Sequence, residues 1–284
     1  MVSVIITAYN VEKFIGKAID SVIGQSFKEL ECVVVEDCSH DNTLAFIEEK
    51  AKGDKRIKIL KNEKNIGAGA SRRRGIEASC GDYILLLDGD DWIEEDFVEA
   101  LYNTAVKNDA EIASGGIKVI HEDGSWEATS YGNCVTTGID KVNKFWGEKI
   151  VFMNNKLISR RLHELVPYCS RRFIEDTPTI IKQLYFANKV AYTDNIGYNY
   201  RMQNESLTHK ASPFKYVLFR ALCVEELTTF FEKHNKEYLK TIPLGLSYAS
   251  LVAKIKELNP TKEMIAPYCE EWIDFTTAML KRLR

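Results

Sequence analysis

The amino-acid sequence predicts an α/β fold with a mostly parallel central sheet and helices on both faces. Two patterns carry this prediction: four short apolar runs alternate with segments of helical periodicity, and polar residues follow directly after several of these runs. The third observation is size, because 284 residues with 45% hydrophobic and 28% charged side chains can bury a large globular core. In open sheets of this class, ligands bind beyond the carboxyl ends of the strands.

The first part of the chain supplies the alternation. Residues 2–8, VSVIITA, form a β-branched apolar run that is typical of a buried parallel strand, and further strands are expected at 31–36, 57–60 and 83–87. Apolar residues at helical spacing predict a helix over 11–23. The DCSHDN segment supplies N-cap candidates for a second helix, and 67–79 reads as a loop entering a third.

The second part of the chain is less regular. We expect a helix over 94–107, a strand over 111–120 and a Gly- and Thr-rich region to about residue 140. Polar and apolar pieces alternate over 156–200 with less clear periodicity. Residues 212–284 carry apolar stripes at helical spacing and are expected to be helical throughout.

Charge and cysteine usage exclude several classes of function. A net charge of -3 gives no general reason to expect nucleic acid as a partner. No window approaches the roughly 18 apolar residues of a transmembrane helix, and MVSVIITAYN lacks the basic region of a signal peptide, so we expect a cytosolic protein. The seven cysteines contain no CxxC pair, which favours reduced thiols over a zinc site.

The stretch YILLLDGDDW (83–92) places three acids at the end of a core strand. Clustered carboxylates repel one another and lose hydration when buried, so the cluster predicts a compensating cation. Asp88 and Asp90 project to the same side of an extended chain, and Gly89 leaves space between them. Their oxygens suit Mg²⁺ or Mn²⁺. The alternative is an N-cap cluster for the next helix, and Asp91 alone fits that role.

Other interpretations of this stretch depend on neighbouring positions. An EF-hand would need an acid or amide at Trp92 and Gly at Ile93, and neither is present. A phosphotransferase pattern, hhhhDxDx(T/V), shares the first half of ILLLDGDDW and would make Asp88 a nucleophile. The GxG within IGAGASRRRG is weak evidence for a dinucleotide site, and the P-loop pattern is absent.

Two charged segments elsewhere are candidates for the site. The run Arg72–Arg74 spans nearly a helical turn, so one arginine can reach an anionic ligand while the others are solvated; a fully solvated basic face is the alternative. In RRFIEDTPT, Glu175 or Asp176 could serve as a general base. The alternative is an acidic pair at a helix N-terminus, with Pro178 near the first turn.

Four of these segments occur together and in a fixed order: VSVIITAYNVEKFIGKAIDSVIGQSFKELECVVVEDCSHDNT, NIGAGASRRRGI, GDYILLLDGDDW and RRFIEDTPTI. In this order they resemble the family 2 glycosyltransferases of the GT-A fold. The resemblance is dense over 2–92, looser to about residue 208 and absent in the C-terminal helices. Members of this family are mostly inverting enzymes that take a sugar from a nucleotide diphosphate.

The resemblance implies a set of nucleotide contacts. Thr7, Ala8 and Tyr9 match the TxYN segment that lines the nucleotide. Asp37 matches the second acid of the family's DDGS motif, which hydrogen-bonds the base. This sequence reads EDCS at that motif, so a cysteine stands where the family has glycine. The backbone shape of this loop can therefore differ from that of the family.

The resemblance also implies roles near the reacting groups. Arg72 matches the arginine of ARNxG, expected near the diphosphate or base, and the DGD segment matches the family's DxD, with Asp88 near the ribose and Asp90 on the metal. Asp176 matches the base that removes a proton from the acceptor hydroxyl. The segment YNYRMQNESLT is similar to YxYRxxxxSxT, so Arg201 is expected to close on the diphosphate.

The resemblance thus implies a catalytic domain over 1–210, divided into a nucleotide-binding half (1–108) and an acceptor-binding half (109–210). Residues 211–284 form a helical extension. The expected activity is metal-dependent, inverting transfer of a hexosyl or N-acetylhexosaminyl group from a nucleotide sugar, expected to be a UDP-sugar, to a hydroxyl of a glycan or lipid-linked acceptor. Mn²⁺ or Mg²⁺ is the expected cofactor. The QxxRW motif of processive synthases is missing, which favours single additions.

Several alternatives stay open at this point. The C-terminal helices, which end in LKRLR, pack on the core, form a homodimer or touch a membrane surface, and the last would make the protein peripheral to the inner face of the cell membrane. The alternatives to a glycosyltransferase are a phosphotransferase with Asp88 as nucleophile and a nucleotide-sugar-binding protein without turnover.

Overall fold

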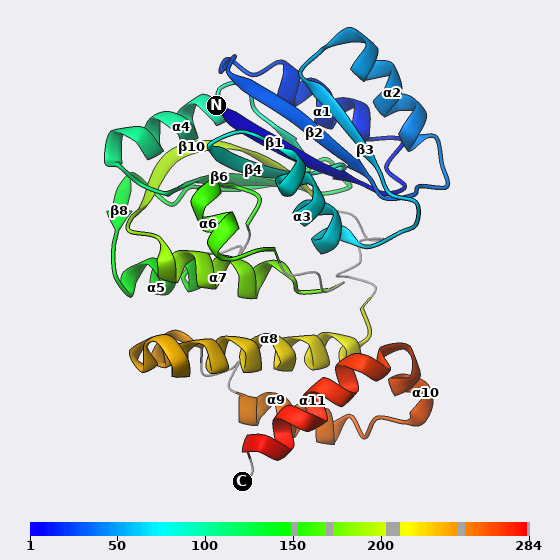
Figure 1. Cartoon of the computed structure of the whole chain (residues 1–284), viewed down its shortest axis with the longest axis vertical. Helices are drawn as coiled ribbons and strands as arrows, with labels where there is room; N and C mark the ends of the chain where they lie inside the picture. Colours follow the sequence, from blue (N-terminus) through cyan, green and yellow to red (C-terminus); the bar gives the residue numbers. More distant parts are fainter. Residues whose placement is uncertain (149–152, 169–172, 203–210, 244–247, 283–284) are drawn as a thin grey trace. The chain divides into compact units, whose positions relative to one another are not determined.

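A computed structural model describes residues 1–148, 153–168, 173–202, 211–243 and 248–282. The chain forms two compact units, residues 1–203 and 204–284. The first unit contains a ten-stranded mixed sheet flanked by helices, and the described part of the second unit is helical (Figure 1). The α/β class predicted from the sequence is therefore confirmed. The assignment of nucleotide-binding and acceptor-binding halves, with a boundary near residue 108, stays a prediction.

One half of the sheet is parallel and the other half is mixed. Four parallel strands lie side by side in the order β3-β2-β1-β4: β1 (Val2–Ala8), β2 (Leu30–Glu36), β3 (Ile57–Lys61) and β4 (Tyr83–Asp88). The sheet continues as β9-β6-β10-β5, with β9 antiparallel to β4 and β6, β10 parallel to β6, and β5 antiparallel to β10. These strands are β5 (Trp92–Ile93), β6 (Ile112–Ile120), β9 (Lys156–Ser159) and β10 (Val190–Arg201). Two short strands, β7 (Trp126–Thr129) and β8 (Cys134–Thr136), pair with β6 and β10.

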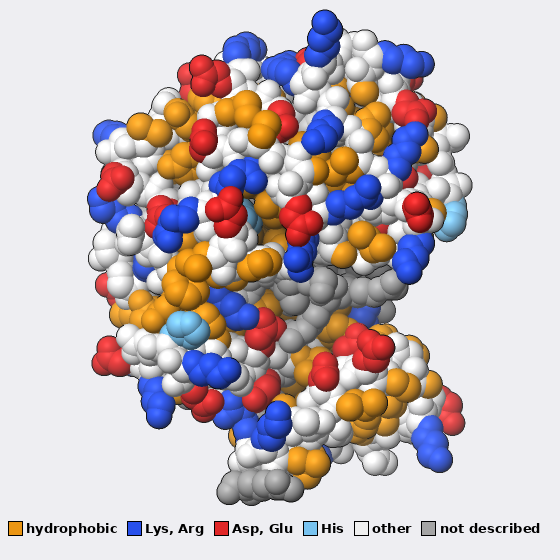
Figure 2. Space-filling model, in the orientation of Figure 1, with side chains coloured by type: hydrophobic (Ala, Val, Ile, Leu, Met, Phe, Trp, Pro, Cys, Tyr) orange, Lys and Arg blue, Asp and Glu red, His pale blue; other side chains and the backbone are white. Residues whose placement is uncertain are grey.

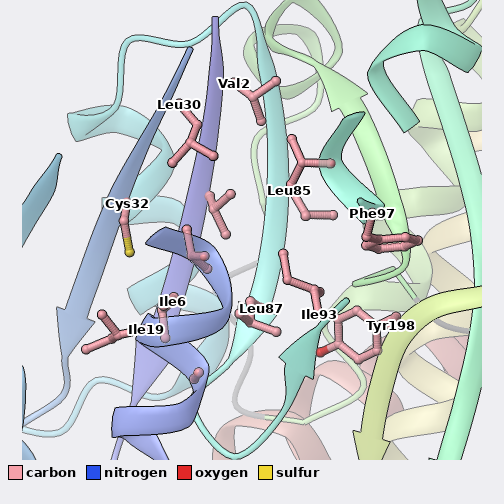
Figure 3. Close-up of a cluster of buried hydrophobic side chains, with 14 of the residues drawn as sticks. Val2, Ile6, Ile19, Leu30, Cys32, Leu85, Leu87, Ile93, Phe97 and Tyr198 are labelled. Atoms are coloured by element: carbon pink, nitrogen blue, oxygen red, sulfur yellow. The ribbon is translucent and has the colours of Figure 1, made fainter. Parts of the chain in front are cut away.

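The parallel strands are apolar on both faces because helices cover both faces. Val4 and Ile6 of β1 belong to the cluster shown in Figure 3, together with residues of α1 (Ile15–Ile23) and α4 (Phe97–Asn108). Ile5 points to the opposite face, toward α3 (Ala68–Ala78). A Cβ on Gly75 of α3 would lie 2.3 Å from Ile5 Cγ2, so this helix packs closely on the sheet only with glycine there.

The predicted helix starts are wrong in two places, each for a local reason. Helix α1 begins at Ile15 instead of residue 11, because residues 11–14 form a turn in which the backbone N–H groups of Phe14 and Ile15 both bond to the Val11 carbonyl. Helix α4 begins at Phe97 instead of residue 94, because Trp92–Ile93 form strand β5. Helix α2 (Thr43–Gly53) follows the DCSHDN segment as expected.

In its described residues, the less regular segment contains three helices that the sequence pattern does not separate. These are α5 (Asp140–Trp146), α6 (Arg160–Leu165) and α7 (Asp176–Phe186). A fully buried ion pair joins Lys156 Nζ to Glu148 Oε2 at 2.8 Å, with both side chains 0% exposed. Tyr192 donates a further hydrogen bond to Glu148 at 3.3 Å, so this pair fixes β9 to β10.

The described part of the second unit has its own apolar core. Its elements are α8 (Pro213–His234), η1 (Lys236–Thr241), α9 (Tyr248–Glu257), α10 (Lys262–Ile265), η3 (Ala266–Tyr268) and α11 (Cys269–Arg282). The Ser212 side chain caps α8 by accepting a bond from Lys215 N at 3.2 Å. Phe214, Leu222 and Phe275 pack together with residues of α9. This core accounts for the apolar stripes seen in the sequence.

No helix in the described residues has the length and apolar character needed to cross a membrane. On the face of the first unit drawn in Figure 2, positive and negative side chains are interspersed. That pattern is typical of an ordinary solvated surface.

Candidate active site

The candidate site begins where three parallel strands end in register. Thr7 of β1 lies beside Asp88 of β4, and Ala8 lies beside Glu36 of β2. The Thr7 hydroxyl donates to Asp88 Oδ1 at 3.3 Å, and the Gly89 N–H donates to the Thr7 carbonyl at 2.9 Å. A Cβ on Gly89 would lie 2.9 Å from that same carbonyl oxygen. Glycine between the two acids therefore allows the DGD turn to sit directly against β1.

Asp88 has hydrogen-bond donors on both carboxylate oxygens. Arg72 Nη2 donates to Oδ1 at 2.7 Å, and Asn154 Nδ2 donates to Oδ2 at 2.9 Å. The side chain is 27% exposed. The Asp88 carboxylate is thus held in place, with solvent access left on one side.

Asp90 lies on the same turn, two residues after Asp88. It is partly exposed, and burial together with the charge of Asp88 raises the pKa of Asp90 to about 6. Arg201 Nε donates to the Asp90 backbone carbonyl at 3.0 Å, and its guanidinium carbon lies 4.6 Å from the Phe14 ring centre and 4.8 Å from the Trp92 ring centre. Arg201 is therefore fixed beside the acidic turn by stacking and one hydrogen bond.

The chemistry of this turn fits a small divalent cation. A carboxylate whose ionised form is disfavoured by burial and by a like charge gains most from an added cation. Two carboxylates also match the number that Mg²⁺ usually takes from a protein. Within the described residues, no group of three or more His, Cys, Asp and Glu side chains is arranged to hold a metal, so any cation here would depend on substrate and water for its other ligands.

Asp91 does not face the same ligand space, and its prediction as an N-cap is wrong. Its buried carboxylate accepts from the Tyr198 hydroxyl at 2.6 Å and from the Arg201 N–H at 2.8 Å, both on β10. The N-cap of α4 is Asp96. Burial and the charges of Asp90 and Asp88 raise the pKa of Asp91 well above its usual range. The third acid therefore joins the turn to β10.

Arg72 connects the acidic turn to the acidic pair at α7. Its guanidinium is buried, with Nη2 on Asp88 and Nη1 donating to Glu175 Oε1 at 2.6 Å and to the Tyr168 hydroxyl at 3.0 Å. The other arginines of the run face elsewhere: Arg73 pairs with Glu77 on the exposed side of α3, and Arg74 Nη1 donates to the Lys61 carbonyl at 2.7 Å. One arginine of the three thus points into the site.

Asp176 is the first residue of α7, next to Glu175. Its Oδ1 accepts from the Thr177 N–H at 2.7 Å, so the pair does lie at a helix N-terminus. Burial raises the pKa of Asp176 and of Glu175, and the positive charge of Arg72 opposes this rise in both. The placement at a helix N-terminus is therefore confirmed, and the role of either acid as a general base stays a prediction. Residues 171 and 172, the basic part of the motif, lie outside the described residues.

The residues expected around the nucleotide lie at the ends of β1 and β2. Tyr9 is 42% exposed, and its ring lies edge-on to His40 with ring centres 6.3 Å apart. Asp37 is buried and accepts from Asn62 Nδ2 and from the backbone N–H groups of Ile66 and Gly67 at 2.7–2.9 Å. Asp37 therefore holds the loop that leads into α3.

The EDCS loop keeps the backbone shape that glycine would favour. Cys38 has φ of 61°, in the left-handed region. The cysteine thus occupies the conformation that the family's glycine would take without strain.

Sequence reasoning missed Asn154, Tyr168 and Tyr198. Asn154 Nδ2 contacts both Asp88 and the Tyr198 hydroxyl, at 2.9 and 3.2 Å, and Tyr198 in turn binds Asp91. Tyr198 and Tyr200 are two residues apart, so they lie on the same face of a strand, and this spacing could have marked both as inward-facing. No spacing in the sequence points to Asn154, because it precedes a short strand in an irregular segment.

The fold and the acid-lined edge of its sheet define a glycosyltransferase of the GT-A fold. The chain belongs to glycosyltransferase family 2: the model of the family described as "Glycosyl transferase family 2" matches residues 3–172. It is 30% identical over 218 residues to Glycosyltransferase GlyA of Streptococcus pneumoniae, which covers 73% of this chain but only 31% of GlyA. It is 28% identical over 269 residues to Putative glycosyltransferase EpsH of Bacillus subtilis, covering 90% of this chain and 77% of EpsH.

Solved structures support the fold. Staphylococcus aureus TarS 1–349 in complex with UDP-GlcNAc superposes with a TM-score of 0.73 at 22% identity, covering 98% of this chain and 81% of TarS 1–349. The mannosyltransferase PcManGT of Pyrobaculum calidifontis, in complex with GDP-Man and Mn²⁺, gives a TM-score of 0.57 at 14% identity, covering 98% of this chain and 84% of PcManGT. Family membership supports sugar transfer over the phosphotransferase alternative.

Proposed function

We propose that the protein transfers a single sugar from a UDP-sugar to a hydroxyl of a glycan or lipid-linked acceptor, with inversion and with a divalent cation. One observation carries the proposal: the buried guanidinium of Arg72 binds Asp88 of the DGD turn and Glu175 of the acidic pair. The carboxylates expected on the donor side and those expected on the acceptor side therefore surround one arginine.

The donor would lie along the ends of β1, β2 and β4. Thr7, Ala8 and Tyr9 would line the nucleotide, and an exposed tyrosine ring such as that of Tyr9 suits stacking on a base. Asp37 already accepts bonds on both oxygens from the loop before α3, so a base would share that carboxylate. Arg201 would contact the diphosphate from its place beside the DGD turn.

Asp90, aided by Asp88, would hold Mn²⁺ or Mg²⁺. The bound cation would supply positive charge that offsets the charge of the departing nucleoside diphosphate. We propose Asp90 as the direct ligand because it matches the second acid of the family's DxD and because burial and the charge of Asp88 raise the pKa of Asp90, a shift that a bound cation would offset. Asp88 is then suited to the ribose.

Asp176 would act as the general base. Its carboxylate would accept the proton of the acceptor hydroxyl while that oxygen bonds to the anomeric carbon and the bond to the diphosphate breaks on the opposite face, which inverts the configuration. Burial raises the pKa of Asp176, and a carboxylate with a raised pKa is a stronger base at neutral pH. An acid at the start of α7 is also fixed in position by its bond from Thr177 N.

The choice of UDP and of the acceptor rests on relatives. TarS was solved with UDP-GlcNAc, and EpsH and GlyA are named as glycosyltransferases of bacteria. A surface glycan or lipid-linked intermediate is the acceptor class we propose, with a place in polysaccharide biosynthesis. The described part of the second unit buries an apolar cluster of its own, and the expected contact of this unit with the core, a homodimer partner or a membrane surface stays a prediction.

The experiment combines donor binding with removal of the base. A thermal-shift panel of UDP, GDP, dTDP and CDP, each with Mn²⁺, Mg²⁺ or EDTA, should show a metal-dependent shift with UDP. Release of UDP from a panel of UDP-sugars should then fall at least 100-fold in Asp176→Asn with UDP binding unchanged. Asp20→Asn, which removes an exposed acid paired with Lys50, is the matched control and should retain turnover. Unchanged turnover in Asp176→Asn would remove that residue from the mechanism.

A further inference from the structure

Glu175 and Asp176 are adjacent acids with different partners. Glu175 Oε1 is bound by Arg72 Nη1 at 2.6 Å, and its side chain is 12% exposed. Asp176 Oδ1 is bound by the Thr177 N–H and more weakly by its hydroxyl, at 2.7 and 3.4 Å. The guanidinium of Arg72 is therefore directed to the first acid, although its charge also acts on the second.

The geometry of Arg72 explains why it does not move to Asp176. The guanidinium is planar, and its two terminal nitrogens are taken by acids on different elements, Asp88 at the end of β4 and Glu175 before α7. The Tyr168 hydroxyl accepts a second bond from Nη1 at 3.0 Å, and its ring centre lies 5.6 Å from the guanidinium carbon. Arg72 is thus held on three sides inside the protein.

We propose that Glu175 is a positioning residue: it occupies one arm of Arg72 and so keeps that arm from pairing with the neighbouring carboxylate of Asp176, which is left to accept a proton. The inference rests on the proposed role of Asp176 as base. Nothing in it requires Glu175 to touch either substrate.

The chemistry of carboxylates favours separate roles for Glu175, as the partner of Arg72, and Asp176, as the base. A carboxylate in a bidentate or charge-assisted pair with arginine loses basicity, because the cation stabilises its ionised form. If the charge of Glu175 were absent, Asp176, on which the charge of Arg72 already acts, would be the adjacent carboxylate in the sequence to take up that arm. The base would then be weakened, while Arg72 Nη2 would keep its bond to Asp88 on the donor side.

The test compares Glu175→Gln with Glu175→Asp and with a matched control. Glu175→Gln keeps an oxygen that can accept from Arg72 but removes the negative charge. We expect kcat for UDP-sugar turnover to fall about 10- to 100-fold, with KM for the donor and the Kd of UDP within threefold of wild type. Glu175→Asp should recover most of the lost kcat. Glu77→Gln removes the exposed partner of Arg73 on the same helix and should change none of these values.

The outcomes separate this inference from the proposed function. Turnover retained in Asp176→Asn would overturn both. Turnover lost in Asp176→Asn but intact in Glu175→Gln would overturn the positioning role alone. A Glu175→Gln variant that loses kcat and UDP affinity in equal measure, without rescue by aspartate, would show a general structural role and would also overturn it.

Discussion

Replacing Asp90 by asparagine should stabilise the folded protein when no divalent cation is bound. Burial, and then the charge of Asp88, raise the pKa of Asp90 from 3.8 to about 6. At 1.36 kcal/mol per pKa unit, this difference corresponds to about 3 kcal/mol of lost stability once the carboxyl is ionised in both states. Because Asp90 is partly exposed, solvent screening reduces the expected gain of the variant to about 1–2 kcal/mol.

The gain has a defined dependence on pH. Below pH 3.8 the carboxyl is protonated in the folded and the unfolded protein, so asparagine brings no advantage. Between 3.8 and about 6 the unfolded chain releases its proton first, and the wild-type protein loses stability relative to the variant. Above pH 6 the difference is constant.

Urea unfolding followed by circular dichroism in EDTA, at pH 4 and at pH 8, measures this difference. Asp88→Asn is the matched control and should have the opposite sign, a loss of about 1.5–3 kcal/mol, because it leaves the buried Arg72 without one of its two acids. The reasoning is refuted if Asp90→Asn is less stable than wild type at pH 8, or if its gain at pH 4 equals that at pH 8.

Three further substitutions test the geometry of the site by urea unfolding. Gly89→Ala should lower the free energy of unfolding by about 1–3 kcal/mol, because the added Cβ would lie 2.9 Å from the Thr7 carbonyl oxygen. The control Gly53→Ala adds a Cβ with no atom within 4 Å and should be neutral or stabilising. Equal effects of the two substitutions would contradict the close approach at Gly89. Cys38→Gly should raise the free energy of unfolding by about 0.5–1 kcal/mol, because glycine adopts φ of 61° without the steric strain of a Cβ. A lower free energy of unfolding would argue against that strain. Tyr198→Phe should lose about 1–3 kcal/mol by removing the hydroxyl bond to buried Asp91, and an unchanged midpoint would count against the bond.

The parallel half of the sheet can be predicted from the sequence, because the patterns that indicate its strands and helices lie within short segments of the chain. Each of the four strands is a short apolar run, and each is followed by residues at helical spacing, so β1 to β4 appear where they are expected. The mixed half does not follow in the same way. Strand β5 has two residues, and its pairing with Tyr198 and Asn199 joins positions about a hundred residues apart, which no local pattern encodes.

The residues of the candidate site also fall into those with a local sequence signal and those without one. The DGD turn and the acidic pair are visible as charged residues in unusual local settings, and Arg72 is one of three candidates in a run. Which arginine faces inward depends on the rotation of α3 on the sheet, which Gly75 sets by its close contact with Ile5. The contacts of Asn154 and the turning of Asp91 toward β10 arise only when the two halves of the sheet meet.

Calorimetric titration of UDP into the wild-type protein and into Asp90→Asn, each with Mn²⁺ and with EDTA, tests the central claim most directly. The account predicts that Mn²⁺ tightens UDP binding at least tenfold in the wild type, and that this gain is lost in Asp90→Asn. UDP binding that is equally tight in EDTA, or a gain from Mn²⁺ that survives in the variant, would contradict a cation held by Asp90 at the end of β4. The same result would leave the metal-dependent donor site without its principal residue.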